Sequence, residues 1–109
     1  YTHSSFDCHQ DHKIIHEETV RAFKHTTILG YSLPWNEVNG SDYRYYNYVS
    51  YTNVKKKQEA LNCYSSQSHR TYFDNEYQKS ILLVNGQMVN TSYAEKFEVI
   101  RYVNHNNSW

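Results

Sequence analysis

The spacing of apolar residues near the start of the chain indicates a helix. Between residues 13 and 25, Ile15, Ala22 and Phe23 follow the three-to-four-residue spacing of an amphipathic helix. Asp11 precedes this stretch and is a residue type that commonly caps a first turn. The sequence therefore predicts a first helix over residues 13–25.

The rest of the pattern predicts strands and helices in mixed order. Runs of β-branched, aromatic or alternating apolar residues indicate strands, and apolar residues at helical spacing indicate helices. The expected strands are residues 26–31, 43–50 and 93–103, and the expected helices are residues 52–64 and 74–86. The sequence thus predicts a mixed α/β fold.

Three residues mark the ends of the two later helices. Thr52 and Asp74 are candidates for the N-cap, and Gly86 occupies a position where a left-handed residue would end a helix. Two groups of side chains are expected to share a face: Val54, Leu61 and Tyr64, pointing inward, and Tyr77, Ile81 and Val84.

Composition narrows the class of protein. The chain has 109 residues, of which 39% are hydrophobic, and this composition favours one soluble globular segment. Its formal net charge is +0, so there is no electrostatic reason to expect a nucleic acid partner. No apolar run approaches the roughly 20 residues that cross a bilayer. Two cysteines do not make a disulfide scaffold, so we expect a reducing, cytoplasmic location. Because the chain begins with Tyr1 rather than Met, we interpret it as part of a longer protein.

Two histidines with a carboxylate between them suggest metal chemistry. His9 and His12 are three residues apart, and Asp11 lies between them. Neutral imidazole is a common metal ligand, and a carboxylate can orient such a ring through its second nitrogen. A catalytic zinc ion usually takes three protein ligands, so at least one further ligand must come from elsewhere.

Several short motifs also occur in a fixed order. They are His9-Gln10-Asp11-His12, His16-Glu17-Glu18, Arg21-Ala22-Phe23-Lys24, Thr26-Thr27-Ile28-Leu29-Gly30-Tyr31, Pro34-Trp35-Asn36, Lys56-Lys57-Gln58-Glu59-Ala60-Leu61, Cys63-Tyr64, Ser66-Gln67, Arg70, Tyr72-Phe73 and Tyr93-Ala94-Glu95-Lys96-Phe97-Glu98-Val99-Ile100-Arg101. In this order they resemble the second half of a PIG-L (LmbE-like) deacetylase. The resemblance covers residues 9–103, with residues 1–8 expected as a loop and residues 104–109 as a polar tail.

The resemblance implies a fold and a reaction. The fold would be the C-terminal part of a Rossmann-like, three-layer α/β domain that lacks its N-terminal strands and helices. The reaction would be zinc-dependent removal of the acetyl group from an N-acetylglucosaminyl-type amino sugar, in which a zinc-bound water attacks the acetyl carbonyl. Other divalent metals and a homo-oligomer stay open. The family's His-Pro-Asp-Asp segment, which supplies two ligands and the general base, is absent, so the chain alone is expected to be inactive and to bind zinc weakly.

The resemblance also assigns roles to individual residues. His12 matches the family's third zinc ligand. His9 matches the histidine that polarises the carbonyl or stabilises the developing charge, and Asp11 matches the acid that supports it through a hydrogen bond. Gln10 replaces the usual proline, and Asp7 stands where some members have a tyrosine, so no additional oxyanion donor is assigned there.

Other residues are weaker candidates. Arg70 could hold a sugar hydroxyl or an anionic group, and Tyr93 could border the pocket, although a structural ion pair and a buried tyrosine explain them equally well. His16 lies one helical turn after His12, where packing or a hydrogen bond is the expected role rather than metal binding. His3 is expected to be incidental.

Three alternative functions follow from the same residues. An aromatic surface could make the chain a non-catalytic carbohydrate-binding or protein-binding module. A small structural zinc domain could use Cys8, Cys63, His9 and His12, although their spacing is irregular. The basic run at residues 55–57, together with the tyrosines of residues 43–51, could contact nucleic acid, although such a run is usually a solvated face.

Overall fold

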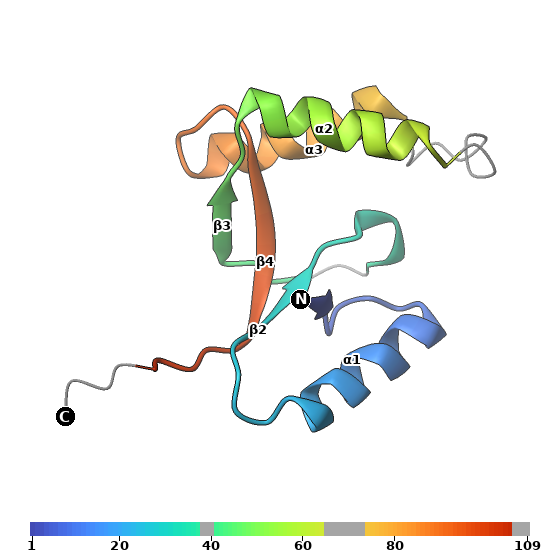
Figure 1. The fold of residues 1–109 in the computed structure, drawn as a ribbon, viewed down its shortest axis with the longest axis vertical. Coiled ribbons are helices and arrows are strands. Elements are labelled where there is room, and N and C mark those ends of the chain that lie inside the picture. Colours follow the sequence, from blue (N-terminus) through green and yellow to red (C-terminus); the bar gives the residue numbers. More distant parts are fainter. Residues whose placement is uncertain (38–40, 65–73, 106–109) are drawn as a thin grey trace. The chain divides into compact units, whose positions relative to one another are not determined.

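The computed structural model describes residues 1–37, 41–64 and 74–105 and has a mixed α/β fold (Figure 1). In chain order the elements are β1 (Thr2–His3), α1 (Gln10–Ala22), β2 (Ile28–Tyr31), the short 3-10 helix η1 (Pro34–Asn36), β3 (Tyr45–Tyr48), α2 (Tyr51–Asn62), α3 (Asn75–Met88) and β4 (Ala94–Arg101). The four strands form one mixed sheet in the order β1-β2-β4-β3. None of the helices in these residues is long and apolar enough to cross a membrane.

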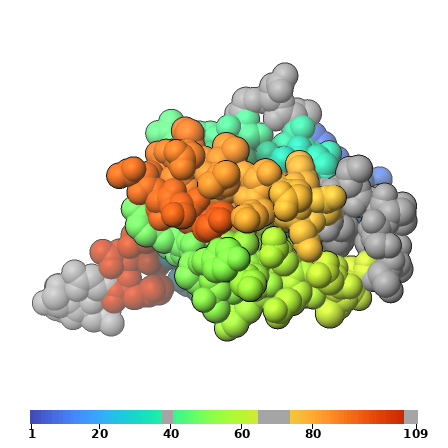
Figure 2. Space-filling model, turned by 90° about the horizontal axis from the view of Figure 1, so that it is seen from above, coloured from blue at the N-terminus to red at the C-terminus, as the bar shows by residue number. Residues whose placement is uncertain are grey.

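The chain divides into two units. One comprises the described parts of Tyr1–Tyr45 and Lys96–Trp109, and the other comprises those of Tyr46–Glu95. In the first unit, β1 pairs in parallel with β2, β2 pairs antiparallel with β4, and α1 connects β1 to β2 (Figure 1). The second unit contains α2 and α3, which pack against each other (Figure 2).

The first strand lies inside the segment that the sequence predicted to be a loop. Thr2 pairs with Gly30, and His3 pairs with Tyr31. A Cβ atom on Gly30 would lie 2.8 Å from the backbone Cα of Ser4, so only glycine allows the two segments to approach this closely. The strand was missed because two residues are too few to show an alternating pattern.

The N-caps of α1 and α2 differ from those that the sequence predicted. His9, rather than Asp11, caps α1, because its ring accepts a hydrogen bond from the backbone N–H of Asp11. Ser50, rather than Thr52, caps α2. The predicted cap of α3 is confirmed, since the Asp74 carboxylate accepts from two backbone N–H groups of the first turn.

The buried face of the helical pair also differs from expectation. Val54 is buried as predicted, but Tyr64 is 56% exposed and Val84 is 63% exposed. The buried residues of α3 are instead Gln78, Leu82, Asn85 and Gly86. Gly86 therefore lies inside the helix rather than after it, and the positive φ occurs at Asn90.

Candidate metal site between the first helix and the first strand

The contact between α1 and the start of the chain is made by polar side chains. His16 Nδ1 lies 2.8 Å from the carbonyl oxygen of His3, and the Thr2 hydroxyl donates to Thr19 at 3.1 Å. No residue of α1 is buried, and Ile15 is 47% exposed. The contact between His16 Nδ1 and the His3 carbonyl confirms the hydrogen bond expected of His16. Polar groups that face inward from a helix require partners, and here the His3 carbonyl and the Thr2 hydroxyl supply them.

Asp7 is at the centre of the site. Only 1% of Asp7 is exposed, and both of its carboxylate oxygens have partners. Oδ1 accepts from the backbone N–H of His9 at 2.9 Å, and Oδ2 lies 2.9 Å from His12 Nδ1. A hydrogen bond of 2.7 Å from the Cys8 backbone N–H to the Asn36 carbonyl holds the segment in place. Asp7 therefore fixes both the start of α1 and one nitrogen of His12.

His3 completes the cluster from the strand. Its Nδ1 lies 3.8 Å from Asp7 Oδ2, and its Nε2 lies 3.1 Å from the Tyr31 hydroxyl. Within the described residues, Nδ1 is buried without a hydrogen-bond partner. Burial, and then the nearby His12, lower the pKa of His3. This shift favours the neutral imidazole, which is the form that binds a metal.

Three imidazole rings lie in a stack. The rings of His3 and His12 are 3.7 Å apart and inclined by 6°, and those of His9 and His12 are 4.2 Å apart and inclined by 19°. The lone pair of an imidazole nitrogen lies in the ring plane, so nearly parallel rings do not aim at one point. A cation bound by both His3 and His12 would require one ring to turn.

The cluster has the donor set of a catalytic zinc site. One ligand atom from each of His3, Asp7 and His12 lies within 4.8 Å of the others. Two histidines and one carboxylate are a known set for catalytic zinc, which keeps a further position open for water or substrate. The unpartnered Nδ1 of His3 supports this assignment, because a buried nitrogen without a partner is costly unless something binds it. These three residues could therefore hold a divalent metal if one of the two rings turned.

The structure places the other candidate residues separately. The ring of His9 stacks on His12 and caps α1, and the backbone N–H of Asp11 donates to His9 Nδ1 at 3.2 Å. The Asp11 side chain is exposed in the first turn of α1. Tyr93 belongs to the other unit and directly precedes β4, where its carbonyl accepts from the backbone N–H of Val49. Arg70 lies outside the described residues.

Sequence reasoning missed two members of the cluster. His3 was expected to be incidental. Asp7 was noted only because some members of the PIG-L family, which the chain resembles, have a tyrosine at the matching position. The available signal was the spacing of His3, Asp7 and His12 within ten residues, just before a predicted helix. That spacing becomes informative only when the strand is known to place His3 beside the helix.

The residues proposed for the alternative functions have other environments. Cys8 and Cys63 are both free and exposed, and neither belongs to the metal-ligand cluster found in the described part of the chain. The ammonium group of Lys55 lies over the Tyr51 ring, 5.6 Å from its centroid. That contact gives Lys55, the first residue of the basic run, a packing partner on its own helix.

Comparison with protein-family models, curated proteins and solved structures gives no match to this chain. The resemblance to PIG-L deacetylases accordingly stays a prediction.

Proposed function

We propose that this chain contains the metal site of a zinc-dependent hydrolase that removes the acetyl group from an N-acetylated amino sugar. The observation that supports the metal site is the cluster around the buried Asp7 carboxylate, in which one ligand atom from each of His3, Asp7 and His12 lies within 4.8 Å of the others. The reaction, the amino-sugar substrate and a Rossmann-like PIG-L domain are proposed from the ordered motifs. A reducing, cytoplasmic location is proposed from the sequence, because two cysteines do not make a disulfide scaffold.

The proposed ligands are His3, Asp7 and His12. A divalent metal held there would polarise the acetyl carbonyl and lower the pKa of a bound water. Asp7 positions His12 in the absence of metal, because its carboxylate accepts a hydrogen bond from Nδ1 and so leaves the lone pair on Nε2.

His9 is the proposed electrostatic residue. It stacks on His12 and is exposed at the start of α1, where it could approach a substrate carbonyl beside the metal. Asp11 would support His9, because the backbone N–H of Asp11 donates a hydrogen bond to His9 Nδ1 and so orients the ring. The resemblance assigns these roles, and the stacking supports them by placing His9 next to a proposed ligand.

Zinc titration of the metal-free chain tests the site. Because the structure adds His3 and Asp7 to His12, we now expect one zinc ion per chain by calorimetry, in place of the weak binding expected from the sequence. His12→Ala should weaken binding by at least tenfold because it removes a direct ligand. His25→Ala is the matched control, since His25 is an exposed histidine after α1. Absence of stoichiometric binding, or equal loss in both variants, would reject this ligand set and favour donors outside this sequence.

A second measurement tests the reaction. Because the His-Pro-Asp-Asp segment that supplies the general base is absent, this chain alone should release no amine from N-acetylglucosamine even with zinc present. Amine release by the chain alone that is lost in His12→Ala would contradict this and would show that the cluster is catalytic without that segment.

A further inference from the structure

The side chain of His3 is held from β2 by Tyr31. In the parallel pairing of β1 with β2, His3 lies opposite Tyr31, so the two side chains are on the same face of the sheet. Their rings meet edge to face with centroids 4.8 Å apart, and the Tyr31 hydroxyl lies 3.1 Å from His3 Nε2. Tyr31 therefore engages Nε2 and leaves Nδ1 as the ring nitrogen without a hydrogen-bond partner among the described residues.

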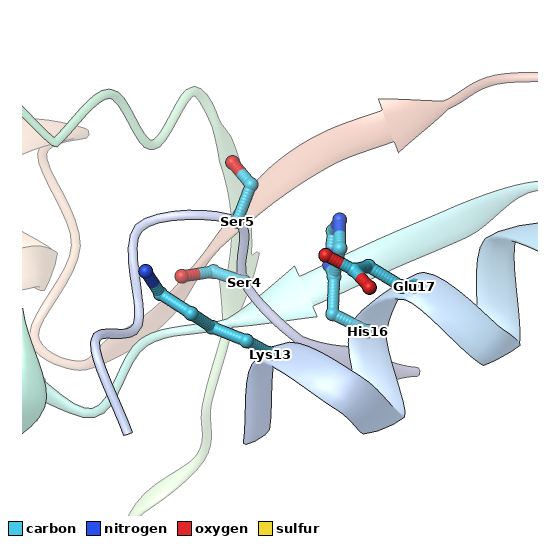
Figure 3. A pocket seen from close by; sticks show the side chains of 5 residues that line it. All are labelled: Ser4, Ser5, Lys13, His16 and Glu17. Carbon is cyan, nitrogen blue, oxygen red and sulfur yellow. The ribbon is translucent and has the colours of Figure 1, made fainter. Parts of the chain in front are cut away.

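The backbone of His3 is fixed independently of this contact. Its strand pairs with β2, and its carbonyl oxygen lies 2.8 Å from Nδ1 of His16, which reaches it from α1. A pocket of about 330 Å³ lies beside His16, and its lining residues are Ser4, Ser5, Lys13, His16 and Glu17 (Figure 3). Because the backbone is held by both β2 and α1, what the Tyr31 hydroxyl sets is the orientation and the tautomer of the His3 ring.

The nitrogen that Tyr31 leaves free lies next to the Asp7 carboxylate. His3 Nδ1 is 3.8 Å from Asp7 Oδ2, which is too long for a hydrogen bond. The same distance is shorter than two metal–ligand bonds of about 2.1 Å laid end to end. One cation could therefore bind both atoms while Tyr31 keeps its hydrogen bond to Nε2.

A tyrosine hydroxyl suits this position because it can both donate and accept a hydrogen bond. Without a metal, the nearby carboxylate favours the hydrogen on His3 Nδ1, so that Nε2 accepts from the Tyr31 O–H. When a cation takes Nδ1, that hydrogen leaves to water, and Nε2 takes a hydrogen from water and donates it to the Tyr31 oxygen. The ring stays neutral throughout. Burial, and then Asp7, raise the pKa of Tyr31, so its hydroxyl keeps its own hydrogen.

We propose that Tyr31 is a positioning residue that makes Nδ1, rather than Nε2, the metal-binding nitrogen of His3. This inference rests on the proposed metal site and adds to it the atom through which His3 binds. Histidines that bind a metal commonly bond their second nitrogen to a neighbouring group, which fixes the tautomer and the ring orientation. Here the strand pairing of β1 with β2 supplies that neighbour.

The tautomer of His3 in the metal-free protein, kept in EDTA, tests this role. By long-range ¹⁵N NMR we expect the hydrogen on Nδ1 in the native protein and an average of both tautomers in Tyr31→Phe, which keeps the aromatic ring and loses only the hydroxyl. Tyr43→Phe is the matched control, because it removes a buried hydroxyl that bonds to Ser4, the residue after His3. That control should leave the His3 tautomer unchanged. An unchanged tautomer in Tyr31→Phe, or the same change in both variants, would overturn the proposal.

Binding of ¹¹³Cd²⁺ identifies the ligand nitrogen directly. We expect scalar coupling between cadmium and His3 Nδ1 and none to Nε2, and Tyr31→Phe should bind cadmium about tenfold more weakly. Coupling to Nε2 of His3, or equal affinity in the two proteins, would overturn the role of Tyr31. If cadmium couples to neither His3 nor His12, the proposed metal site itself fails, and the measurement in EDTA still decides whether Tyr31 sets the tautomer of His3.

Discussion

At the scale of single residues, Asp7 determines how the candidate site is organised. Its two oxygens accept from the His9 backbone and from His12 Nδ1 at 2.9 Å each. In Asp7→Asn, an amide N–H₂ group facing His12 would favour the opposite tautomer, with the hydrogen on Nε2 and the lone pair on Nδ1. Long-range ¹⁵N NMR of the metal-free protein should detect this exchange, and zinc affinity should fall roughly 10- to 100-fold.

Asp11→Asn is the matched control for that variant, because Asp11 is an exposed aspartate two residues from His9. It should leave the His12 tautomer unchanged. If Asp7→Asn retained the native tautomer and full zinc affinity, Asp7 would neither orient His12 nor bind the metal.

Tyr43 provides a second test at this scale, through pH. Tyr43 is buried, and its hydroxyl donates to the Glu37 carboxylate and lies 2.7 Å from the Ser4 hydroxyl. Burial first, and then the hydrogen bond to Glu37, raise the pKa of Tyr43 above its ordinary value of 10.0. A raised folded-state pKa gives stability that is complete below the unfolded pKa and is lost as the pH rises toward the folded pKa.

Tyr43→Phe should therefore be less stable than the native protein by about 1 kcal/mol at pH 8, where Tyr43 is protonated in both states. The difference should shrink as the pH rises from 10 to 11, because the native protein loses this contribution while the variant has none to lose. Urea unfolding across this range measures both values. Tyr102→Phe, at a position 71% exposed, should show no difference at any pH, and a constant difference for Tyr43→Phe would contradict the shift.

At the scale of elements, Gly86 shows that packing can outweigh helix propensity. It is buried within α3, where alanine is normally better than glycine by about 1 kcal/mol. A Cβ atom there would lie 2.6 Å from the backbone carbonyl oxygens of Thr91 and Ser92. Because backbone atoms cannot move aside cheaply, we expect Gly86→Ala to lower the free energy of unfolding by about 1–3 kcal/mol.

Thermal or urea unfolding of the protein measures that effect. Gln87→Ala, at the next and exposed position of α3, is the control and should be neutral or slightly stabilising. An increase in stability for Gly86→Ala would mean that the helix and the turn after it are not packed as tightly as the structure indicates.

The elements also show what the sequence could reveal. The helices and longer strands were predicted because their periods are local, and the Asp74 cap follows from one side chain. A helical pattern shows which residues share a face but not which face packs. Tyr77, Ile81 and Val84 were predicted to share a face, and of these Tyr77 and Val84 are exposed and Ile81 is half-buried. The pairing of Thr2 with Gly30 spans 28 positions and has no local signature, so the approach of His3 to His12 could not be predicted.

At the scale of the whole molecule, the two cysteines distinguish the proposed site from a structural zinc domain. Cys8 is in the first unit and Cys63 in the second, and both thiols are free and exposed. A zinc ion held by Cys8, Cys63, His9 and His12 would require both thiolates, whereas the proposed ligands include neither cysteine. We expect both thiols of the folded protein to react with Ellman's reagent at similar rates before and after one equivalent of zinc. The variants Cys8→Ser and Cys63→Ser show which reaction rate belongs to which thiol. Protection of both thiols by zinc would show that the metal is bound by the two cysteines instead of by the cluster around Asp7.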